Sequence, residues 1–311
     1  MWRLLVILAL GLSAAFQTGG SEGSIEAFID AEMPAVGVPG LAYAVVADGV
    51  TSVGARGATK IGSGRKVTSD TAFLTGSISK SFTALAVMQL IEAGAIGLDT
   101  EVSHYLERFS DQPVGAITIR QLLSHTSGFS TLQGNTSHTD ITGGKNELAS
   151  RVDQLAQMNP AHKPDQRWEY SNTNYQILGR LIEVVSGQEY QAYIALNILE
   201  SVGMEHSFVA DGEIHESMAA GHTPWFGTTR PLPKKTTDRG TAPQGGIVAS
   251  ATDLASYMQM MMNGRNDVLS AEGKARMMRP ASDASPGYGF GWFVDSSNGA
   301  VGQRRQRAGI R

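Results

Sequence analysis

A serine and a lysine three residues apart form the strongest chemical motif in this chain. In the stretch GSISKSF, Ser77 and Lys80 open an apolar-rich segment, and residues three apart share one face of a helix. A serine hydroxyl becomes a good nucleophile when a neighbouring base takes its proton. A lysine can be that base when burial or nearby positive charge lowers its pKa. The motif predicts a nucleophilic serine, although S-x-x-K alone also occurs at ordinary capped helix starts.

A tyrosine and an asparagine in EYSNTNY form a second motif. Tyr170 and Asn172 are two apart in a stretch that reads as extended, so their side chains point the same way. A tyrosine hydroxyl beside an ammonium group ionises more easily and can carry a proton. An asparagine amide can bond both the lysine and a substrate carbonyl. The alternative is a polar turn that leads into a helix expected to begin at Asn174.

Other polar residues offer weaker chemistry. Ser79 and Ser81 do not stand three residues before a lysine, so neither is predicted to be the nucleophile. His125, in the stretch HTSG, is interpreted as structural because Gly128 suits the left-handed turn that ends a helix. The seven histidines show no ligand spacing and the chain has no cysteine. We therefore expect no metal, no cofactor and no thiolate chemistry.

The elements that must position these residues follow from local patterns. Gly40–Gly57 reads as two strands around an Asp-Gly turn, Ser77–Gly94 as an apolar-rich helix, and Thr118–Ser124 as a short helix with a capping box. Further helices are predicted at Asn174–Ser186, Glu189–Ser201 and Thr252–Asn263, and a strand, turn and second strand at Tyr288–Val301. Residues 130–167 and 205–245 are predicted to be loops and irregular structure.

This order of elements predicts an α/β fold. Strands lie toward both ends of the chain, so we expect an antiparallel sheet platform built from residues 24–76 and 246–311 and flanked by helices. Residues 77–245 form a mostly helical inserted lobe in this interpretation, within one domain that spans residues 21–311.

Bulk properties narrow the function. The chain has 311 residues, 41% of them hydrophobic, and a net charge of −4 that includes four arginines in the last eight residues. An acidic body argues against nucleic acid as a partner. Residues 1–20 resemble a secretory signal, with Arg3 before an apolar run too short to span a bilayer comfortably. We expect a periplasmic or secreted protein with a small-molecule or peptide substrate and no stable membrane span; the oligomeric state stays open.

Several longer stretches occur in the order of one enzyme family. From about Gly40 to Val301 the chain carries TAFLTGSISKSFTALAVMQLIEAGAIGLDTEVSHYL, TIRQLLSHTSG, YSNTNYQILGRLIEVVSG, GGIVASATDLASYM and YGFGW. Together they resemble the serine β-lactamase-type hydrolases, in the branch with class C β-lactamases, D-alanyl-D-alanine carboxypeptidases and family VIII carboxylesterases. The resemblance implies hydrolysis of an amide or ester through an acyl-enzyme. It implies Ser77 as nucleophile, Lys80 and Tyr170 as the base pair, and Asn172 as the orienting residue.

The third motif of that family is not where the resemblance predicts it. A K-T-G or H-x-G motif should follow YGFGW near Ala300, but the chain continues as GQRRQRAGIR. The stretch KKTTDRG at Lys234–Gly240 lies upstream and has Thr237 where the motif needs glycine. Natural truncation is one hypothesis. Loss of two bases is the other, since GC-rich codons for this tail read GHSGGSAPGF when two bases are restored. Either predicts missing C-terminal strands, and leaves a non-catalytic or defective penicillin-binding relative as the alternative function.

Overall fold

The computed structural model describes residues 21–136, 147–213, 215–232, 238–262, 265–297 and 299–302. The predicted secretory signal and the arginine-rich tail lie outside these residues. The helices are α1 Ser21–Val36, α2 Ser79–Glu92, α3 Ile119–Leu123, α4 Thr131–Thr136, α5 Glu147–Leu155, α6 Asn172–Ser186, α7 Tyr190–Ile194, α8 Ala242–Gly245, α9 Ala251–Met262 and α10 Ala271–Met277. The strands are β1 Gly40–Ala47, β2 Val50–Gly57, β3 Phe73–Leu74, β4 Phe208–Val209, β5 His222–Trp225, β6 Thr228–Pro231, β7 Ile247–Ala249, β8 Phe293–Asp295 and β9 Ala300–Gly302. Within the described part of the chain, no helix is both long and apolar enough to span a membrane.

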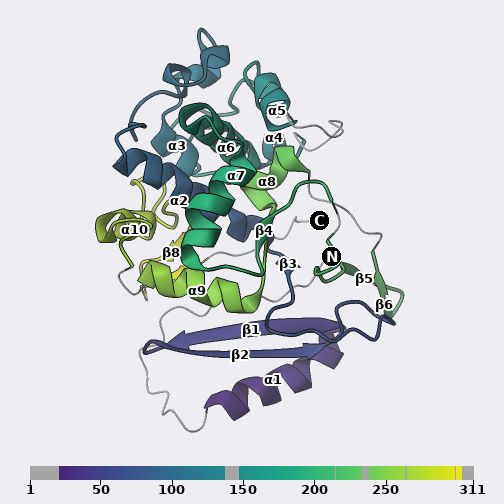
Figure 1. Ribbon diagram of the computed structural model, residues 1–311. Helices are drawn as coiled ribbons and strands as arrows, with labels where there is room; N and C mark the ends of the chain where they lie inside the picture. The colour runs from purple at the N-terminus through teal and green to yellow at the C-terminus, as the bar shows by residue number, and fades with distance from the viewer. Residues whose placement is uncertain are drawn as a thin grey trace.

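The predicted N-terminal hairpin is confirmed. Strands β1 and β2 pair antiparallel from Gly40 opposite Gly57 to Ala47 opposite Val50. Asp48 and Gly49 both have positive φ, at 50° and 79°, as a tight hairpin turn requires. In Figure 1 the hairpin lies between helices α1 and α9. Helix α9 packs on both strands, and Arg56 of β2 forms ion pairs with Glu26 and Asp30 of α1.

The fold is α/β with antiparallel sheets, as expected, but the strands form separate sheets. In the described residues β1–β2 and β8–β9 are two-stranded, and β3–β7–β4 is a three-stranded sheet. The predicted platform from both chain ends is confirmed at β3 and β7, because β3 lies in residues 24–76, β7 lies in residues 246–311, and the two strands pair antiparallel. Strand β7 is central to the site, because it pairs with β3 just before the nucleophile motif and with β4 on its other side.

Helix α2 forms the centre of the core. It packs against α6, α7, α8 and α10, and its residues from Ser79 to Met88 are all buried. A helix that is buried on every side needs small and apolar residues all round, which the stretch SFTALAVM provides. Gly291 of YGFGW lies directly against it: a Cβ there would come within 2.8 Å of the Lys80 carbonyl oxygen. This close approach places the YGFGW landmark on the nucleophile helix.

Two regions expected to lack regular structure contain elements. Residues 130–167 include α4 and α5, and α5 packs through apolar positions on α6. Residues 205–245 include β4, α8 and the β5–β6 hairpin, in which Pro224 and Pro231 lie on a two-stranded sheet. Proline is tolerated on such edge strands, so these residues are compatible with the sheet, and the prediction of irregular structure is wrong here.

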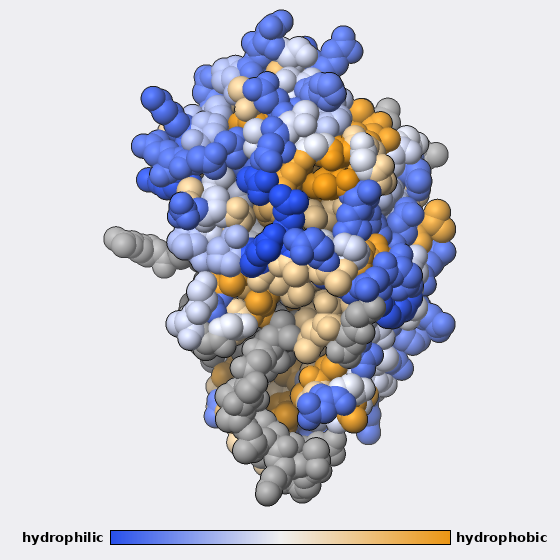
Figure 2. Space-filling view, turned by 90° about the vertical axis from the view of Figure 1, so that its left-hand side faces the viewer, coloured by the Kyte–Doolittle hydropathy of each residue, from blue (hydrophilic) through white to orange (hydrophobic). Residues whose placement is uncertain are grey.

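Hydrophilic side chains cover most of the face seen in Figure 2, and hydrophobic areas interrupt them mainly in its upper half.

The capping box predicted for the short helix α3 is confirmed: Thr118 N–H donates to Gln121 Oε1 at 2.9 Å, and Gln121 N–H donates to Thr118 Oγ1 at 3.3 Å. Helix α3 ends at Leu123, and the chain then continues into the HTSG turn, which lies beside the candidate site.

Candidate active site

The predicted nucleophile lies in a short turn before α2. Ser77 belongs to a 3₁₀ turn, Gly76–Ile78, and the α-helix begins at Ser79 rather than at Ser77 as predicted. Ser77 is only partly buried, whereas Lys80 is fully buried. The serine is thus open to a substrate while the lysine beneath it is shielded from water.

Strand β7 holds this turn in place. Thr75 N–H and Thr75 Oγ1 donate to the Ile247 carbonyl at 2.9 and 2.8 Å, and Ile247 N–H donates to Ser79 Oγ at 2.8 Å. The three bonds bracket Ser77 on both sides along the chain. Ser79 is therefore not a nucleophile, in agreement with the spacing argument, but it does tie the nucleophile turn to the sheet.

Lys80 is held by two acceptors. Its Nζ donates to Asn172 Oδ1 at 2.9 Å and to the Gln244 carbonyl at 2.8 Å. Within the described chain, these two are the hydrogen bonds of Lys80, and neither of them joins the lysine to Ser77. Burial lowers the pKa of Lys80 well below its ordinary value, because a charged amine is disfavoured away from water. The structure thus favours the neutral amine that a base requires.

Tyr170 makes the direct contact with the serine. Its hydroxyl donates to Ser77 Oγ at 2.8 Å, and Lys80 Nζ lies 4.8 Å from the centre of its ring. Burial raises the pKa of Tyr170, and the bond to Ser77 opposes that shift only in part. The expectation that Tyr170 ionises easily is therefore wrong. Its resting form is the neutral phenol, which can pass a proton on rather than store one.

Asn172 is the first residue of α6, not part of an extended segment as predicted. Ser171 before it is extended, with φ −141° and ψ 130°, so the chain turns into the helix between Tyr170 and Asn172. Both side chains still reach the same place, one contacting Ser77 and the other Lys80. The four predicted residues Ser77, Lys80, Tyr170 and Asn172 thus form one connected group.

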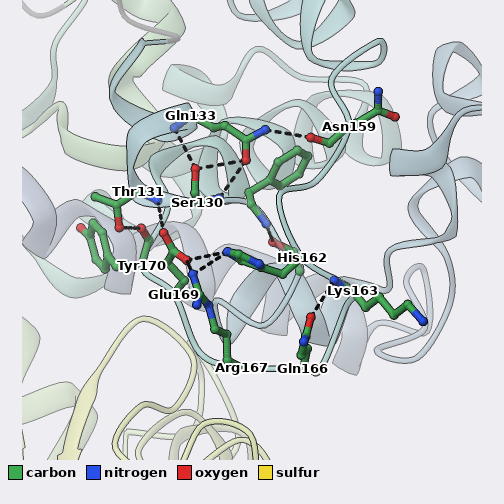
Figure 3. Close-up of polar contacts among 12 residues, drawn as sticks. Ser130, Thr131, Gln133, Asn159, His162, Lys163, Gln166, Arg167, Glu169 and Tyr170 are labelled. Carbon is green, nitrogen blue, oxygen red and sulfur yellow. Dashed lines mark hydrogen bonds and ion pairs between the residues drawn. The ribbon is translucent and has the colours of Figure 1, made fainter.

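The segment before Tyr170 is cross-linked to the start of α4. Thr131 Oγ1 donates to the Tyr170 carbonyl at 2.6 Å, and Thr131 N–H donates to Glu169 Oε1 at 2.9 Å. In Figure 3 the Glu169 carboxylate also meets Arg167 and His162. Burial disfavours the Glu169 carboxylate, but these donors together hold its pKa below the ordinary value. The chain leading to Tyr170 is therefore anchored through polar contacts.

The backbone contribution of Gln244 and the clamp made by Ser79 were missed by sequence reasoning. Gln244 acts through its backbone carbonyl, which every residue has, so the sequence gives no sign of it.

The upstream stretch KKTTDRG has a structural use where it is described: Asp238 caps a 3₁₀ turn by accepting from Thr241 N–H at 2.7 Å, and it binds Arg151. The described residues contain no cluster of three potential metal ligands.

Comparisons with known proteins identify the family of the chain. The Beta-lactamase family matches residues 25–308. Penicillin-binding protein 4 of Amycolatopsis lactamdurans is 33% identical over 284 residues, covering 85% of this chain and 73% of its own length. Protein flp of Staphylococcus aureus strain MRSA252 is 26% identical over 292 residues, covering 91% of this chain and 58% of its own length.

A solved structure shares the fold. The octameric penicillin-binding protein homologue from Pyrococcus abyssi superposes with a TM-score of 0.76 at 28% identity, covering 88% of this chain and 65% of that one. The chain thus spans less than two thirds of the Staphylococcus and Pyrococcus relatives. The family match over most of the chain, the Amycolatopsis relative and the shared fold lead to one conclusion: this chain belongs to the Beta-lactamase family of serine hydrolases.

Proposed function

We propose that this chain hydrolyses an amide or ester through an acyl-enzyme on Ser77. The observation that carries the proposal is the 2.8 Å hydrogen bond between Tyr170 and Ser77, formed beside a buried lysine. A hydroxyl with an adjacent proton acceptor and an open approach is the arrangement that nucleophilic catalysis needs. The names of the penicillin-binding relatives support the same chemistry.

The reaction begins with attack of Ser77 Oγ on the substrate carbonyl carbon. The new C–O bond forms as the carbonyl electron pair moves to oxygen. The Tyr170 hydroxyl, which donates to Ser77 Oγ at rest, turns its own proton toward Lys80 Nζ and accepts the Ser77 proton. This order follows from the two opposite shifts, since Tyr170 stays neutral and Lys80 is the group poised to gain a proton. The Ser77 N–H contributes to the stabilisation of the oxyanion.

The oxyanion then collapses and expels the amine or alkoxide, which takes the proton back from Lys80 through Tyr170. Water attacks the resulting ester along the same proton route and frees the acid and Ser77. Asn172 contributes by fixing Lys80, since its Oδ1 accepts one of the lysine's hydrogen bonds at 2.9 Å. Its amide nitrogen is the group we expect to face a substrate carbonyl.

A panel of probes tests the proposal and narrows the substrate class. The purified protein is mixed with a fluorescent penicillin, nitrocefin, a D-Ala-D-Ala peptide and p-nitrophenyl butyrate. We expect a covalent adduct on the Ser77 peptide with at least one probe, absent in Ser77→Ala and retained in Ser81→Ala, a nearby serine in helix α2. An adduct that survives Ser77→Ala, or no reaction with any probe, contradicts the proposal. A stable adduct without turnover identifies a penicillin-binding protein that does not turn over.

We further propose that residues 1–20 direct secretion, on the strength of the basic residue and apolar run there. N-terminal sequencing of the protein from a periplasmic or culture fraction tests this, and an intact Met1 in a cytoplasmic fraction contradicts it.

A further inference from the structure

One histidine holds the backbone on both sides of Tyr170. The His125 carbonyl accepts the N–H of Glu169 at 2.9 Å, and His125 Nδ1 accepts the N–H of Ser171 at 3.2 Å. Glu169 and Ser171 flank Tyr170, so a single residue restrains the peptide units before and after it. The position of the Tyr170 hydroxyl on Ser77 depends on these peptide units, because a short shift of the backbone moves the whole ring.

The His125 ring is itself locked by packing. It is 1% exposed, and its centre lies 4.5 Å from that of the Tyr170 ring and 4.9 Å from that of Tyr288. The His125 backbone has φ 61°, a conformation that non-glycine residues seldom adopt. Strained backbone of this kind persists where surrounding contacts fix it, and it gathers at functional sites. The structure therefore keeps a histidine where a glycine would be relaxed.

The hydrogen bonds also define the chemical form of the ring. Nδ1 faces two donors, Ser171 N–H and Asn174 Nδ2 at 3.0 Å, so it carries no proton. Burial lowers the pKa of His125 and keeps the ring neutral. The proton thus lies on Nε2, which has no hydrogen-bond partner among the described residues. An apolar residue could fill this space without leaving such an unpartnered group, but it could not accept the Ser171 N–H.

We propose that His125 is a positioning residue that holds the Tyr170 hydroxyl on Ser77 by clamping the backbone from Glu169 to Ser171. It acts through Tyr170 and touches neither the serine nor a substrate. This inference rests on the proposed function for its rate prediction, whereas its structural part can be measured without catalysis. A misplacement of about 1 Å in a catalytic group can lower a rate about 100-fold.

A double-mutant cycle with Tyr170 tests the mechanism. The rate of acylation is measured with p-nitrophenyl butyrate or the fluorescent penicillin for the whole protein and for His125→Ala, Tyr170→Phe and the double variant. We expect His125→Ala to slow acylation about 100-fold. In the Tyr170→Phe background the same change should cost less than about threefold, since residues that act as one unit are not additive. His125→Asn, which keeps an acceptor near the Nδ1 position, should recover at least about tenfold over His125→Ala.

Ser127→Ala is the matched control. Its hydroxyl donates to Asn174 Oδ1 at 2.6 Å in the same buried network but does not contact the Tyr170 segment. We expect it to acylate at nearly the normal rate. Should His125→Ala fail to fold, His125→Asn is taken through the same cycle, with an expected loss of about tenfold that disappears in the Tyr170→Phe background. A normal rate in the His125 variant, or an undiminished loss in that background, overturns the proposal.

Hydrogen exchange of the peptide that contains Glu169–Asn172 distinguishes a failure of the His125 clamp from a failure of the proposed acyl-enzyme function. We expect its amides to exchange faster in His125→Ala, or in His125→Asn to a smaller extent, and not in Ser127→Ala. If no probe acylates the normal protein, the proposed function fails while the clamp is still decided by exchange. Unchanged exchange in the His125 variants overturns the clamp even if acylation is seen.

Discussion

The nucleophile turn and the Tyr170 segment meet at one hydrogen bond but are held in different ways. The turn is tied to strand β7 by three bonds, all made to the backbone of Ile247. The Tyr170 segment lies outside any sheet and is held by His125 on one side and Thr131 on the other. The serine therefore has the support of a strand, whereas the tyrosine depends on a few individual residues.

The lysine and the tyrosine also differ in the direction in which burial shifts their pKa. Burial lowers the pKa of Lys80 and raises the pKa of Tyr170, because in each case it disfavours the charged form. The tyrosine is thus neutral at rest, and burial shifts the lysine toward the neutral amine that can gain a proton. We infer that the tyrosine conducts the proton and the lysine receives it. The following predictions test this division, from the largest effect to the smallest.

Ser77→Ala should lower acylation by more than about a thousandfold, because the other serines nearby are committed to structural hydrogen bonds. Ser81, for example, donates to the Ile78 carbonyl at 2.8 Å. Ser81→Ala is the control, and the measurement is the rate of p-nitrophenol release together with mass spectrometry of the acylated peptide. Adduct formation elsewhere in Ser77→Ala would show that the turn does not carry the nucleophile.

Lys80→Arg should be almost as damaging as Lys80→Ala, with a loss of about 100-fold to 10,000-fold in acylation. Arginine stays protonated at any working pH and so cannot receive the proton. Tyr170→Phe should lose a comparable factor if the tyrosine conducts the proton to Lys80. Near-normal acylation by Lys80→Arg, measured under single-turnover conditions, would mean that positive charge alone is sufficient and that the tyrosine receives the proton.

The two motifs could be found in the sequence because their spacing is short. Ser77 and Lys80 are three apart, Tyr170 and Asn172 two apart, and the hairpin turn at Asp48 has its own local signature. The contacts that hold the motifs could not be found, since Ser79 and Ile247 are 168 residues apart in the chain and His125 and Ser171 are 46 apart. Such pairings arise from tertiary packing and leave no local pattern.

The missed elements have a similar explanation. Helix α5 is short and polar overall, but Leu148, Val152 and Leu155 recur at helical spacing and are all buried. The helical spacing of these apolar residues is visible in the sequence, but the polar composition around them favours the loop that was predicted. The elevated pKa of Tyr170 could not be foreseen, because it depends on how deeply the packed structure buries the ring.

Ser79→Ala should destabilise the fold by about 1–3 kcal/mol, since it leaves the buried Ile247 N–H without its acceptor. Ser81→Ala removes the donor to the Ile78 carbonyl, three residues earlier, and leaves no backbone N–H without its acceptor, so its cost should stay below about 1 kcal/mol. Urea unfolding of the two variants measures the difference directly. Equal costs would show that the link to β7 contributes no more than a local helix bond, and that the two halves of the site are not held differently.

The most gradual effect is a pH dependence that reports the state of Lys80. Between its lowered folded pKa and its ordinary value of 10.5, the unfolded chain binds a proton that the folded chain does not. The free energy of unfolding should therefore rise with pH in this window, by up to about 1.4 kcal/mol per pH unit. Below the folded pKa the lysine is protonated in both states, and the contribution is flat at its least favourable value.

Lys80→Met isolates this contribution, because it removes the titrating group while keeping a long side chain in the core. The variant leaves Asn172 Oδ1 and the Gln244 carbonyl without their donor, but this cost is the same at every pH. The stability of the normal protein relative to Lys80→Met should thus increase with pH from the lowered folded pKa of Lys80 up to the ordinary lysine value of 10.5, and level off above it. Urea unfolding of both proteins across that range provides the measurement. A difference that stays constant would mean that Lys80 keeps its proton in the folded protein, so that the proton from Ser77 would have to stop at Tyr170.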